Sequence, residues 1–275
     1  EYFLYFRMKK RMAVWLHGGL GTGHFSQGYP ALEKLLVGLS SSYEIVVYSQ
    51  SHPNEEYCPS EFVIRSAPLR IRRSSIRWLC LLYYFAKDHW RKKFQLLFAF
   101  WGYPAGLLAT IISRLIGIPV AIYLLGSDSA GVASIKFGVF QKPISRKLAL
   151  WTYNRASLLL GISEYQKKQL VAFGVKASIN IIPWGTDTTF YKSDYKKPGE
   201  VLHIVHVGHL NPVKDQTTLI KTFALIIKER PAQLRVLGED CLNGAIQKLS
   251  RELGVDENID FFGLIPYSQM SQHYE

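Results

Sequence analysis

Short apolar runs alternate with helix-patterned segments along most of this chain, and that alternation constrains its fold more than any other feature. Ser163 opens a capping-box sequence, and Gly174 can close the helix that follows it. Strands that alternate with helices are typical of a parallel sheet with helices on both faces. The predicted strands lie near residues 12–16, 44–49, 61–64, 96–100, 120–124, 157–160 and 179–182.

A polar segment at residues 191–200 interrupts the alternation, which then restarts. A chain of 275 residues is long enough for two domains. The sequence therefore predicts an α/β fold with two doubly wound domains, over residues 8–190 and 201–275, joined by a linker over 191–200. Residues 267–275 are typical of a helix cut off as it begins, so we expect a second domain that is incomplete and a chain truncated at its C-terminus. Strands of the second domain are predicted near residues 201–207, 233–237 and 259–262.

The cysteines and the charge indicate the setting of the protein. Cys58, Cys80 and Cys241 are odd in number, far apart and without metal-ligand spacing, which favours a reducing cytoplasm over a disulfide scaffold. No secretory signal precedes the first predicted strand. The formal net charge is +12, and residues 65–93 contain nine Lys or Arg and a single acid, Asp88. This concentration of positive charge indicates an anionic surface as a partner.

A helix predicted around residues 74–91 combines that charge with an apolar run. Nine consecutive apolar residues, 78–86, have basic residues on both sides, a pattern that suits an anionic surface such as the inner face of the cell membrane. The alternative is a buried helix whose charged ends reach solvent. Nucleic acid is not predicted as a partner, because no recognised binding motif accompanies the charge. The predicted membrane-surface residues are Arg72, Arg73, Arg77, Trp78, Trp90, Arg91, Lys92 and Lys93.

Residues 94–113 form a run of 20 positions without charge, the length that a transmembrane helix needs. Gly102 and Pro104 lie inside the run, and Arg114 follows it. Glycine and proline at these positions favour a strand, a turn and a helix over one membrane span.

A glycine-rich stretch, residues 18–23, follows the first predicted strand. A Walker loop needs Lys and then Ser or Thr after the last glycine, where this chain has His24 and Phe25. A dinucleotide fingerprint needs an acid after the second strand, where residues 48–50 supply none, and this disfavours a Rossmann oxidoreductase. The glycines can still let a ligand approach the backbone at the end of a parallel strand; the alternative is a merely flexible turn.

A second loop, residues 208–215, presents Lys214 at the start of a predicted helix. Backbone N–H groups at a helix N-terminus attract anions, and an ammonium adds a full positive charge, so the loop suits a phosphate ligand. The alternative is an ordinary strand-loop-helix corner with a solvated lysine. His203 and His209 would lie about 20 Å apart along a strand, so no histidine metal site is predicted. No Asp-x-Asp pair occurs, so we expect neither a divalent ion nor another cofactor.

Five short motifs follow one another along the chain: Trp101-Gly102-Tyr103-Pro104-Ala105-Gly106, Gly126-Ser127-Asp128, Gly161-Ile162-Ser163-Glu164, residues 182–187 with Phe190, and the loop 208–215. In this order they resemble the retaining glycosyltransferases of family 4, also called group 1, over about residues 10–275. The resemblance implies the GT-B fold, in which two Rossmann-like domains face a cleft. The N-terminal domain of that family holds the acceptor, and the C-terminal domain holds the nucleotide sugar.

The resemblance implies catalytic roles for Lys214, on the donor diphosphate, and for Asp128, near the transferred sugar or the acceptor. It places Gly18 and Gly19 near the donor phosphates. Charge grows on the phosphate as the glycosidic bond breaks, so preorganised donors at that point lower the barrier. The donor-binding residues implied in this way are Gly18, Gly19, Gly208, His209, Asn211, Lys214, Gly238, Glu239, Gly263 and Leu264.

Two positions depart from the family pattern. An arginine common in the loop is His209 here, so a second permanent cation is missing at neutral pH. The family's paired glutamates, which hold the donor sugar and ribose, would lie beyond Glu275. We therefore expect the parent protein to be an enzyme and this fragment to be an incomplete catalyst.

The sequence and the resemblance together predict a metal-independent hexosyltransferase. It would move a sugar from a nucleotide-sugar donor to a glycan or lipid-linked acceptor with retention of configuration, in synthesis of cell-envelope polysaccharide. We expect it in the cytoplasm, peripheral on the inner face of the cell membrane. The alternative is a non-catalytic sugar- or nucleotide-binding module with a GT-B-like fold, which His209 and the absent glutamates motivate.

Overall fold

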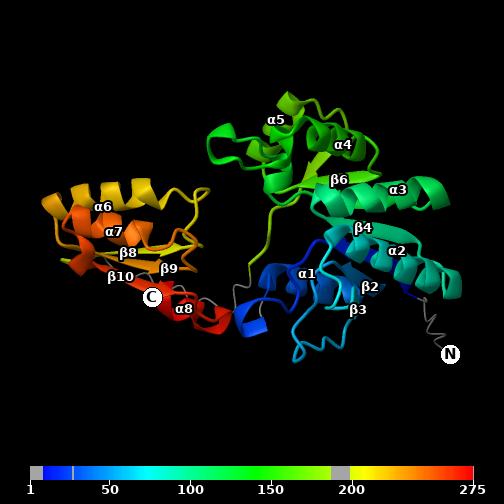
Figure 1. The fold of residues 1–275 in the computed structure, drawn as a ribbon, viewed down its shortest axis with the longest axis horizontal. Coiled ribbons are helices and arrows are strands. Elements are labelled where there is room, and N and C mark those ends of the chain that lie inside the picture. Colours follow the sequence, from blue (N-terminus) through cyan, green and yellow to red (C-terminus); the bar gives the residue numbers. More distant parts are fainter. Residues whose placement is uncertain (1–8, 27, 187–198, 275) are drawn as a thin grey trace, which may run out of the picture. The chain divides into compact units, whose positions relative to one another are not determined.

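The computed structural model describes residues 9–26, 28–186 and 199–274. The chain divides into two compact units, Glu1–Thr186 and Asp187–Glu275 (Figure 1). The predicted linker over residues 191–200 lies mostly outside the described residues, as do the predicted domain limits at residues 8 and 190 and the motif residue Phe190.

The first unit is built on a seven-stranded sheet in which every neighbouring pair of strands is parallel. The strand order is β3-β2-β1-β4-β5-β6-β7, so the chain moves first to one edge of the sheet and then to the other. This order is that of a doubly wound fold. The strands are β1 (Lys10–Leu16), β2 (Tyr43–Ser49), β3 (Val63–Ser66), β4 (Leu96–Phe100), β5 (Val120–Tyr123), β6 (Leu158–Gly161) and β7 (Ile179–Ile181).

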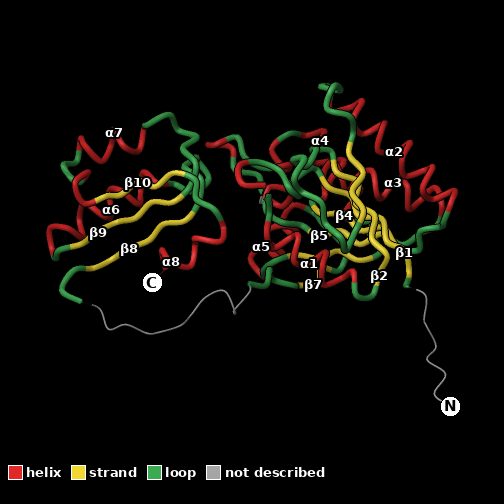
Figure 2. Tube along the Cα trace, turned by 90° about the horizontal axis from the view of Figure 1, so that it is seen from below, coloured by secondary structure: helices red, strands yellow, loops and turns green. Residues whose placement is uncertain are grey.

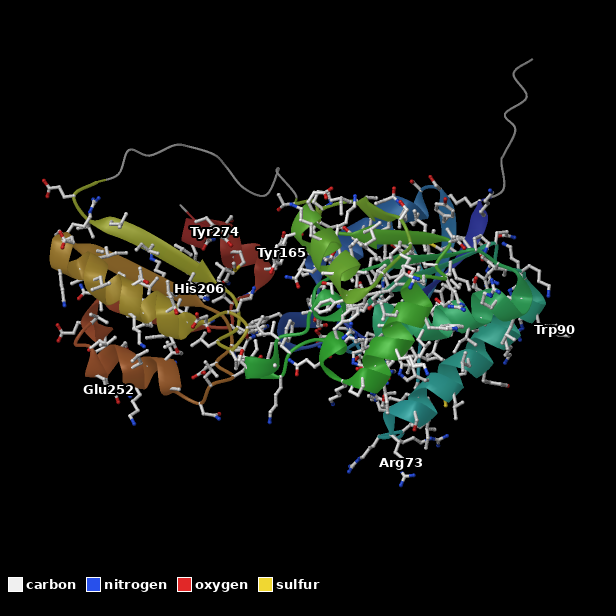
Figure 3. All side chains as sticks on the ribbon, turned by 90° about the horizontal axis from the view of Figure 1, so that it is seen from above. Arg73, Trp90, Tyr165, His206, Glu252 and Tyr274 are labelled. Carbon is white, nitrogen blue, oxygen red and sulfur yellow. The ribbon has the colours of Figure 1, made fainter. Side chains whose placement is uncertain are left out.

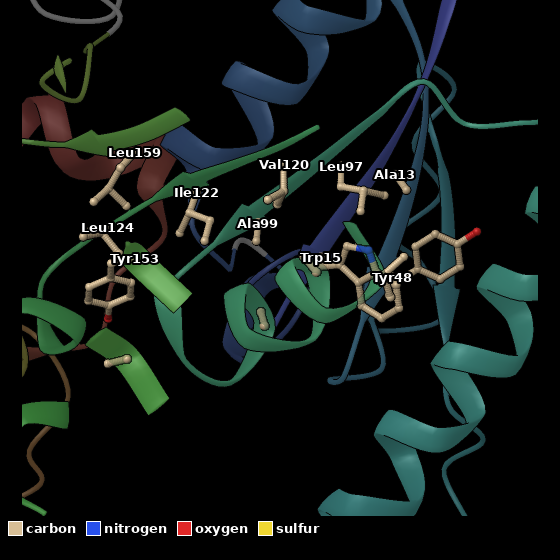
Figure 4. Packing of buried hydrophobic residues seen from close by; sticks show 14 of the residues in the cluster. Ala13, Trp15, Tyr48, Leu97, Ala99, Val120, Ile122, Leu124, Tyr153 and Leu159 are labelled. Atoms are coloured by element: carbon tan, nitrogen blue, oxygen red, sulfur yellow. The ribbon is translucent and has the colours of Figure 1, made fainter. Parts of the chain in front are cut away.

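Helices cover both faces of this sheet because its central strands are apolar on both sides. Ala13 and Trp15 of β1 join one core cluster, while Met12, Val14 and Leu16 join the other. The first cluster, part of which Figure 4 shows, receives residues from α2 to α5; the second receives residues from α1. The helices are α1 (Pro30–Ser40), α2 (Ser74–Arg91), α3 (Leu107–Ile116), α4 (Pro143–Tyr153) and α5 (Glu164–Phe173).

The second unit has a three-stranded parallel sheet in the order β10-β9-β8 (Figure 2). Its core joins Leu234 and Val236 of the central strand to Ile220 and Phe223 of the first helix and Ile246 of the second. The strands are β8 (Leu202–Val207), β9 (Ala232–Leu237) and β10 (Ile259–Gly263), and the helices are α6 (Gln216–Glu229), α7 (Ala245–Glu252) and α8 (Met270–Tyr274).

The predicted strand at residues 61–64 is wrong in its limits, since β3 runs from Val63 to Ser66. Val63 pairs with Val46 at the edge of the sheet, and Phe62 is buried just before the strand begins. An edge strand buries one face at most, so its sequence pattern marks its ends poorly.

The uncharged run at residues 94–113 forms β4, a turn over Gly102–Gly106 and most of α3, as the sequence favours. Among the residues that the structure describes, no helix has both the length and the apolar character that a membrane span requires.

The prediction that Trp78 lies on the membrane-facing surface of α2 is wrong, because Trp78 is buried. The Trp78 ring stacks with Trp15 at 6.5 Å between centroids, and Leu81 and Phe85 point into the same cluster. These positions recur every three or four residues, so one side of the helix faces the sheet. Arg77 is half-buried and donates to the carbonyl oxygen of Ile71 at 2.8 Å.

Two leucines of α2 allow a matched test of this orientation. Leu81 is 0% exposed and Leu79 is 63% exposed. We expect Leu81→Ala to lower the free energy of unfolding of the first unit by about 2–5 kcal/mol, because it removes buried contacts and leaves a cavity. Leu79→Ala should change it by less than about 0.5 kcal/mol. Urea denaturation followed by circular dichroism measures both, and equal losses would contradict the orientation.

Candidate functional site

Glycines end all three strands of the second sheet and bring their loops into close contact. The N–H of Gly208 donates to the carbonyl of Leu237 at 2.8 Å, and the N–H of Gly238 donates to the carbonyl of Gly263 at 2.8 Å. Gly238 has φ +144°, and a Cβ there would lie 2.2 Å from the carbonyl oxygen of Gly208. Only glycine permits this approach, which places the loops after β8 and β9 side by side.

Lys214 lies across the end of β8. A Cβ at Gly208 would lie 3.4 Å from Lys214 Cε, so the lysine stem passes directly over this glycine. The Lys214 N–H donates to the carbonyl of Asn211, and the Asn211 side chain accepts from the Val213 N–H at 3.0 Å. Asp215 then caps α6 by accepting from Thr218. This turn holds an exposed ammonium at the carboxyl edge of the sheet.

The buried amide of Gln216 fixes the loop that carries Lys214. Its Nε2 donates to the carbonyl of His209 at 2.9 Å and lies 3.1 Å from His206 Nε2, while its Oε1 accepts from the N–H of Asn211 at 3.2 Å. Gln216 is not predicted from the sequence, because a glutamine in the first turn of a helix gives no pattern signal of burial. Gln216 is a positioning residue of the candidate site.

His206 lies on β8, and its ring and the Lys214 stem both approach Gly208. Burial lowers the pKa of His206 from its ordinary value, and the positive charge of Lys214 lowers it further. A neutral imidazole at this position can exchange a hydrogen bond with Gln216 and adds no second charge to the edge.

His209 and Glu239 meet between the loops after β8 and β9. The Glu239 N–H donates to His209 Nδ1 at 3.3 Å, and a carboxylate oxygen of Glu239 lies 3.8 Å from the same nitrogen. A ring nitrogen that accepts from an N–H carries no proton, so in this geometry Nδ1 makes no ion pair with the carboxylate. The permanent cation of the loop 208–215 is therefore Lys214.

The structure thus brings together all the predicted donor-binding residues except Gly18 and Gly19 at one edge of the second sheet. Leu264 follows Gly263, which has φ +68° at the end of β10. Asp240, beside Glu239, accepts from the N–H groups of Leu242 and Gly244 and shapes the loop after β9.

Gly18 and Gly19 lie at the carboxyl end of β1 in the first unit, where side chains fill the space beside them. A Cβ at Gly19 would lie 1.9 Å from the Tyr29 ring, and a Cβ at Gly18 would lie 2.6 Å from Ser51 Oγ. The Tyr29 N–H donates to the carbonyl of Gly19 at 2.7 Å. These glycines make room for Tyr29 and Ser51, so a ligand contact there stays a prediction.

His17, which is not among the predicted site residues, precedes these glycines. Its ring stacks on Trp78 with centroids 6.4 Å apart, and burial lowers its pKa. A neutral imidazole at the end of β1 can donate or accept a hydrogen bond.

Asp128 is 1% exposed and ties two loops of the first sheet together. Its carboxylate accepts from the N–H groups of Gly102 at 2.9 Å, Gly126 at 2.9 Å and Leu125 at 3.2 Å. Burial raises the pKa of Asp128, and these N–H donors oppose that rise. The geometry makes Asp128 a positioning residue, while its predicted contact with sugar or acceptor stays a prediction.

Gln166 repeats this arrangement one strand further along. Its Oε1 accepts from the Ile162 N–H at 2.7 Å, and its Nε2 donates to the carbonyl of Leu124 and the hydroxyl of Ser129. The loops after β5 and β6 are therefore joined through one buried amide, as the loop after β8 is organised by Gln216.

No group of three or more His, Cys, Asp or Glu side chains in the described part of the chain is arranged to hold a metal ion.

Each unit therefore has a parallel sheet with organised loops at its carboxyl edge, the place where doubly wound α/β proteins bind ligands. Residues 32–190 match the model of Glycosyltransferase Family 4, and residues 187–275 match that of Glycosyl transferases group 1. The chain belongs to glycosyltransferase family 4. No curated protein sequence matches it.

Solved structures agree with this assignment at the level of the fold. Sucrose-phosphate synthase from Thermosynechococcus elongatus has a TM-score of 0.73 and 14% identity, over 97% of this chain and 73% of that one. The lipopolysaccharide outer core galactosyltransferase WaaB has a TM-score of 0.63 and 17% identity, over 95% and 71%. HepE from Anabaena, solved with UDP and glucose, has a TM-score of 0.63 and 15% identity, over 93% and 70%. The fold is GT-B.

The proximity of Lys214 and His206 can be tested without measuring activity. Lys214→Ala should raise the pKa of His206 partway towards its ordinary value, because it removes the repelling charge and leaves the burial unchanged. Lys221→Ala, an exposed lysine of α6, is the control and should leave this pKa unchanged. Imidazole NMR titration measures both variants, and an unmoved His206 in Lys214→Ala would place the ammonium elsewhere.

Asp128→Asn should destabilise the first unit by about 2–4 kcal/mol, because an amide nitrogen would face buried N–H donors that lose their acceptor. Asp240→Asn makes the same change where the carboxylate is partly exposed, so water can replace the lost bonds. We expect a cost below about 1 kcal/mol there. Thermal unfolding of both variants provides the comparison, and a neutral Asp128→Asn would contradict the positioning role.

Proposed function

We propose that this protein transfers a sugar from a nucleotide-sugar donor to a glycan or lipid-linked acceptor, with retention of configuration. The observation that carries the proposal is the position of Lys214, whose stem crosses Gly208 at the carboxyl edge of the second sheet. Family membership supplies the reaction class.

The chemistry needs stabilisation of a leaving nucleoside diphosphate. As the bond from the sugar to the phosphate breaks, negative charge grows on the phosphate oxygen. The ammonium of Lys214 and the N–H groups at the start of α6 are suited to that charge. The acceptor hydroxyl then bonds to the sugar from the side of the leaving phosphate, which takes the hydroxyl proton, so no protein base is required.

A positioned lysine can take the role that a divalent ion has in sites with an Asp-x-Asp pair, which this sequence lacks. We therefore propose transfer without a metal ion. Substitution of Lys214 should then not be rescued by Mg²⁺ or Mn²⁺.

The relatives of known structure support a nucleotide-sugar donor and an envelope glycan. HepE was solved with UDP and glucose, and WaaB is a galactosyltransferase of the lipopolysaccharide outer core. We propose that this protein acts in the cytoplasm, on a cell-envelope glycan or its lipid-linked precursor.

The geometry of His209 favours one alternative, a module that binds a sugar or nucleotide without turnover. Because the Glu239 N–H occupies Nδ1 of His209, this nitrogen is not offered to a diphosphate in the structure. Calorimetry with UDP and GDP, beside a turnover assay with a panel of their sugars and with glycan and lipid-linked acceptors, separates the two functions. Turnover with one donor supports the transferase, and binding without turnover supports the module. No single result supports both functions.

Lys214→Ala in the whole protein should lower kcat by about 10²–10³-fold, the usual cost of losing one preorganised donor to a developing anion. Its melting temperature should change little, because the side chain is exposed. Lys221→Ala removes an equal charge from α6, the helix that follows the Lys214 loop, and should keep full turnover. A Lys214→Ala enzyme with unchanged kcat would remove this residue from the site.

A further inference from the structure

Helix α2 presents an apolar stripe to solvent on the side away from the sheet. Ile76, Leu79, Tyr83 and Trp90 are exposed and follow one another at intervals of three, four and seven residues, so they lie along one line of the helix. Leu79 and Tyr83 are each 63% exposed, and Trp90 is 83% exposed. The stripe is separate from the buried residues Trp78, Leu81 and Phe85, because those point into the core.

Basic side chains flank this stripe at both ends of α2. Arg72 and Arg73 precede the helix, and Arg91 and Lys93 end or follow it; all four are exposed. Figure 3 shows Arg73 and Trp90 at opposite ends of α2, both directed away from the body of the first unit. Lys87 adds an exposed charge within the helix.

The one acid between residues 65 and 93 does not offset these charges at the surface. Asp88 is buried, accepts from the Tyr48 hydroxyl at 3.0 Å, and pairs with Arg65 at 3.1 Å. Lys92 is not counted among the free cations, because its ammonium pairs at the surface with Glu44 of β2. The outward side of α2 is therefore apolar in its middle, with exposed arginines and lysines towards both ends.

We propose that this side of α2, defined by Ile76, Leu79, Tyr83 and Trp90 with their flanking arginines and lysines, docks on an anionic lipid bilayer. An 18-residue helix is about 27 Å long and can lie in the plane of the headgroups, with the stripe among the acyl chains and the cations among lipid phosphates. The tryptophan and tyrosine rings suit the boundary between headgroups and hydrocarbon.

The combination of charge and aliphatic surface selects a bilayer over other anionic partners. Nucleic acid would use the arginines and lysines, but it offers nothing that covers Leu79 or Ile76. A second copy of the chain would cover the stripe but would bring two clusters of like charge together, which costs free energy.

The test uses flotation of the full chain with vesicles of pure phosphatidylcholine and with vesicles that also contain phosphatidylglycerol. The chain should float with the anionic vesicles alone, and added salt should weaken the binding. The charge variant Arg73→Gln with Arg91→Gln should bind about 25-fold more weakly, since each basic residue near the surface contributes about fivefold. The apolar variant Leu79→Ser with Trp90→Ser should bind more than tenfold more weakly.

The matched control is Leu225→Ser, because Leu225 is 62% exposed on α6 of the second unit, close to the exposure of Leu79. It should bind vesicles as the wild type does. Circular dichroism confirms that each variant is folded, and all the substituted residues are exposed, so loss of binding is not loss of fold.

Several outcomes would overturn the proposal. Equal flotation with both vesicle types, or none with either, excludes an anionic bilayer. Vesicle binding that survives loss of Leu79 and Trp90 and depends only on charge makes the surface a general polyanion site. Dimerisation in sedimentation experiments that is lost in Leu79→Ser assigns the stripe to a second copy of the chain. The readout involves no sugar transfer, so its failure is distinct from failure of the proposed function.

Discussion

Backbone groups that leave the end of a parallel sheet still need hydrogen-bond partners, and both sites of this structure depend on how that need is met. In the first unit the Asp128 carboxylate and the Gln166 amide accept from loop N–H groups after β4, β5 and β6. In the second unit Gln216 holds the loop after β8. All three side chains are buried and sit in a helical turn next to the loops that they bind. This arrangement gives loops without regular structure a fixed shape, on which exposed groups can act.

Positive charge is used in two different ways. Lys214 is a single ammonium held over Gly208, beside a His206 whose pKa is lowered and a His209 that accepts a hydrogen bond. Such a site suits a small anion that must be placed accurately. The cations around α2 are exposed, spread along the helix and joined to an apolar stripe, which suits an extended surface. Asp88, the single acid between residues 65 and 93, is buried and pairs with Arg65, so it does not offset the exposed cations at the ends of α2.

The sequence predicted the features that depend only on residues close together in the chain. The strand and helix order and the Ser163 cap and Gly174 terminus of α5 follow from spacing and residue type, while Gly238 and Gly263 were implied by the family resemblance. Trp78 was assigned to the surface, since an unbroken apolar run does not reveal which of its residues face inward. Gln166 and Gln216 were missed because burial of an amide is set by loops that are distant in sequence.

By itself, the sequence determined the class of fold, the order of the strands along the chain and the presence of a lysine before a helix at the end of β8, because periodicity and turn chemistry act over a few residues. Only the tertiary structure decided which side of α2 faces solvent, that Asp128 is enclosed by N–H donors, and that Tyr29 fills the space beside Gly19. Those features arise where segments far apart in the chain come into contact, and contact between distant segments decides whether a polar or apolar side chain is buried.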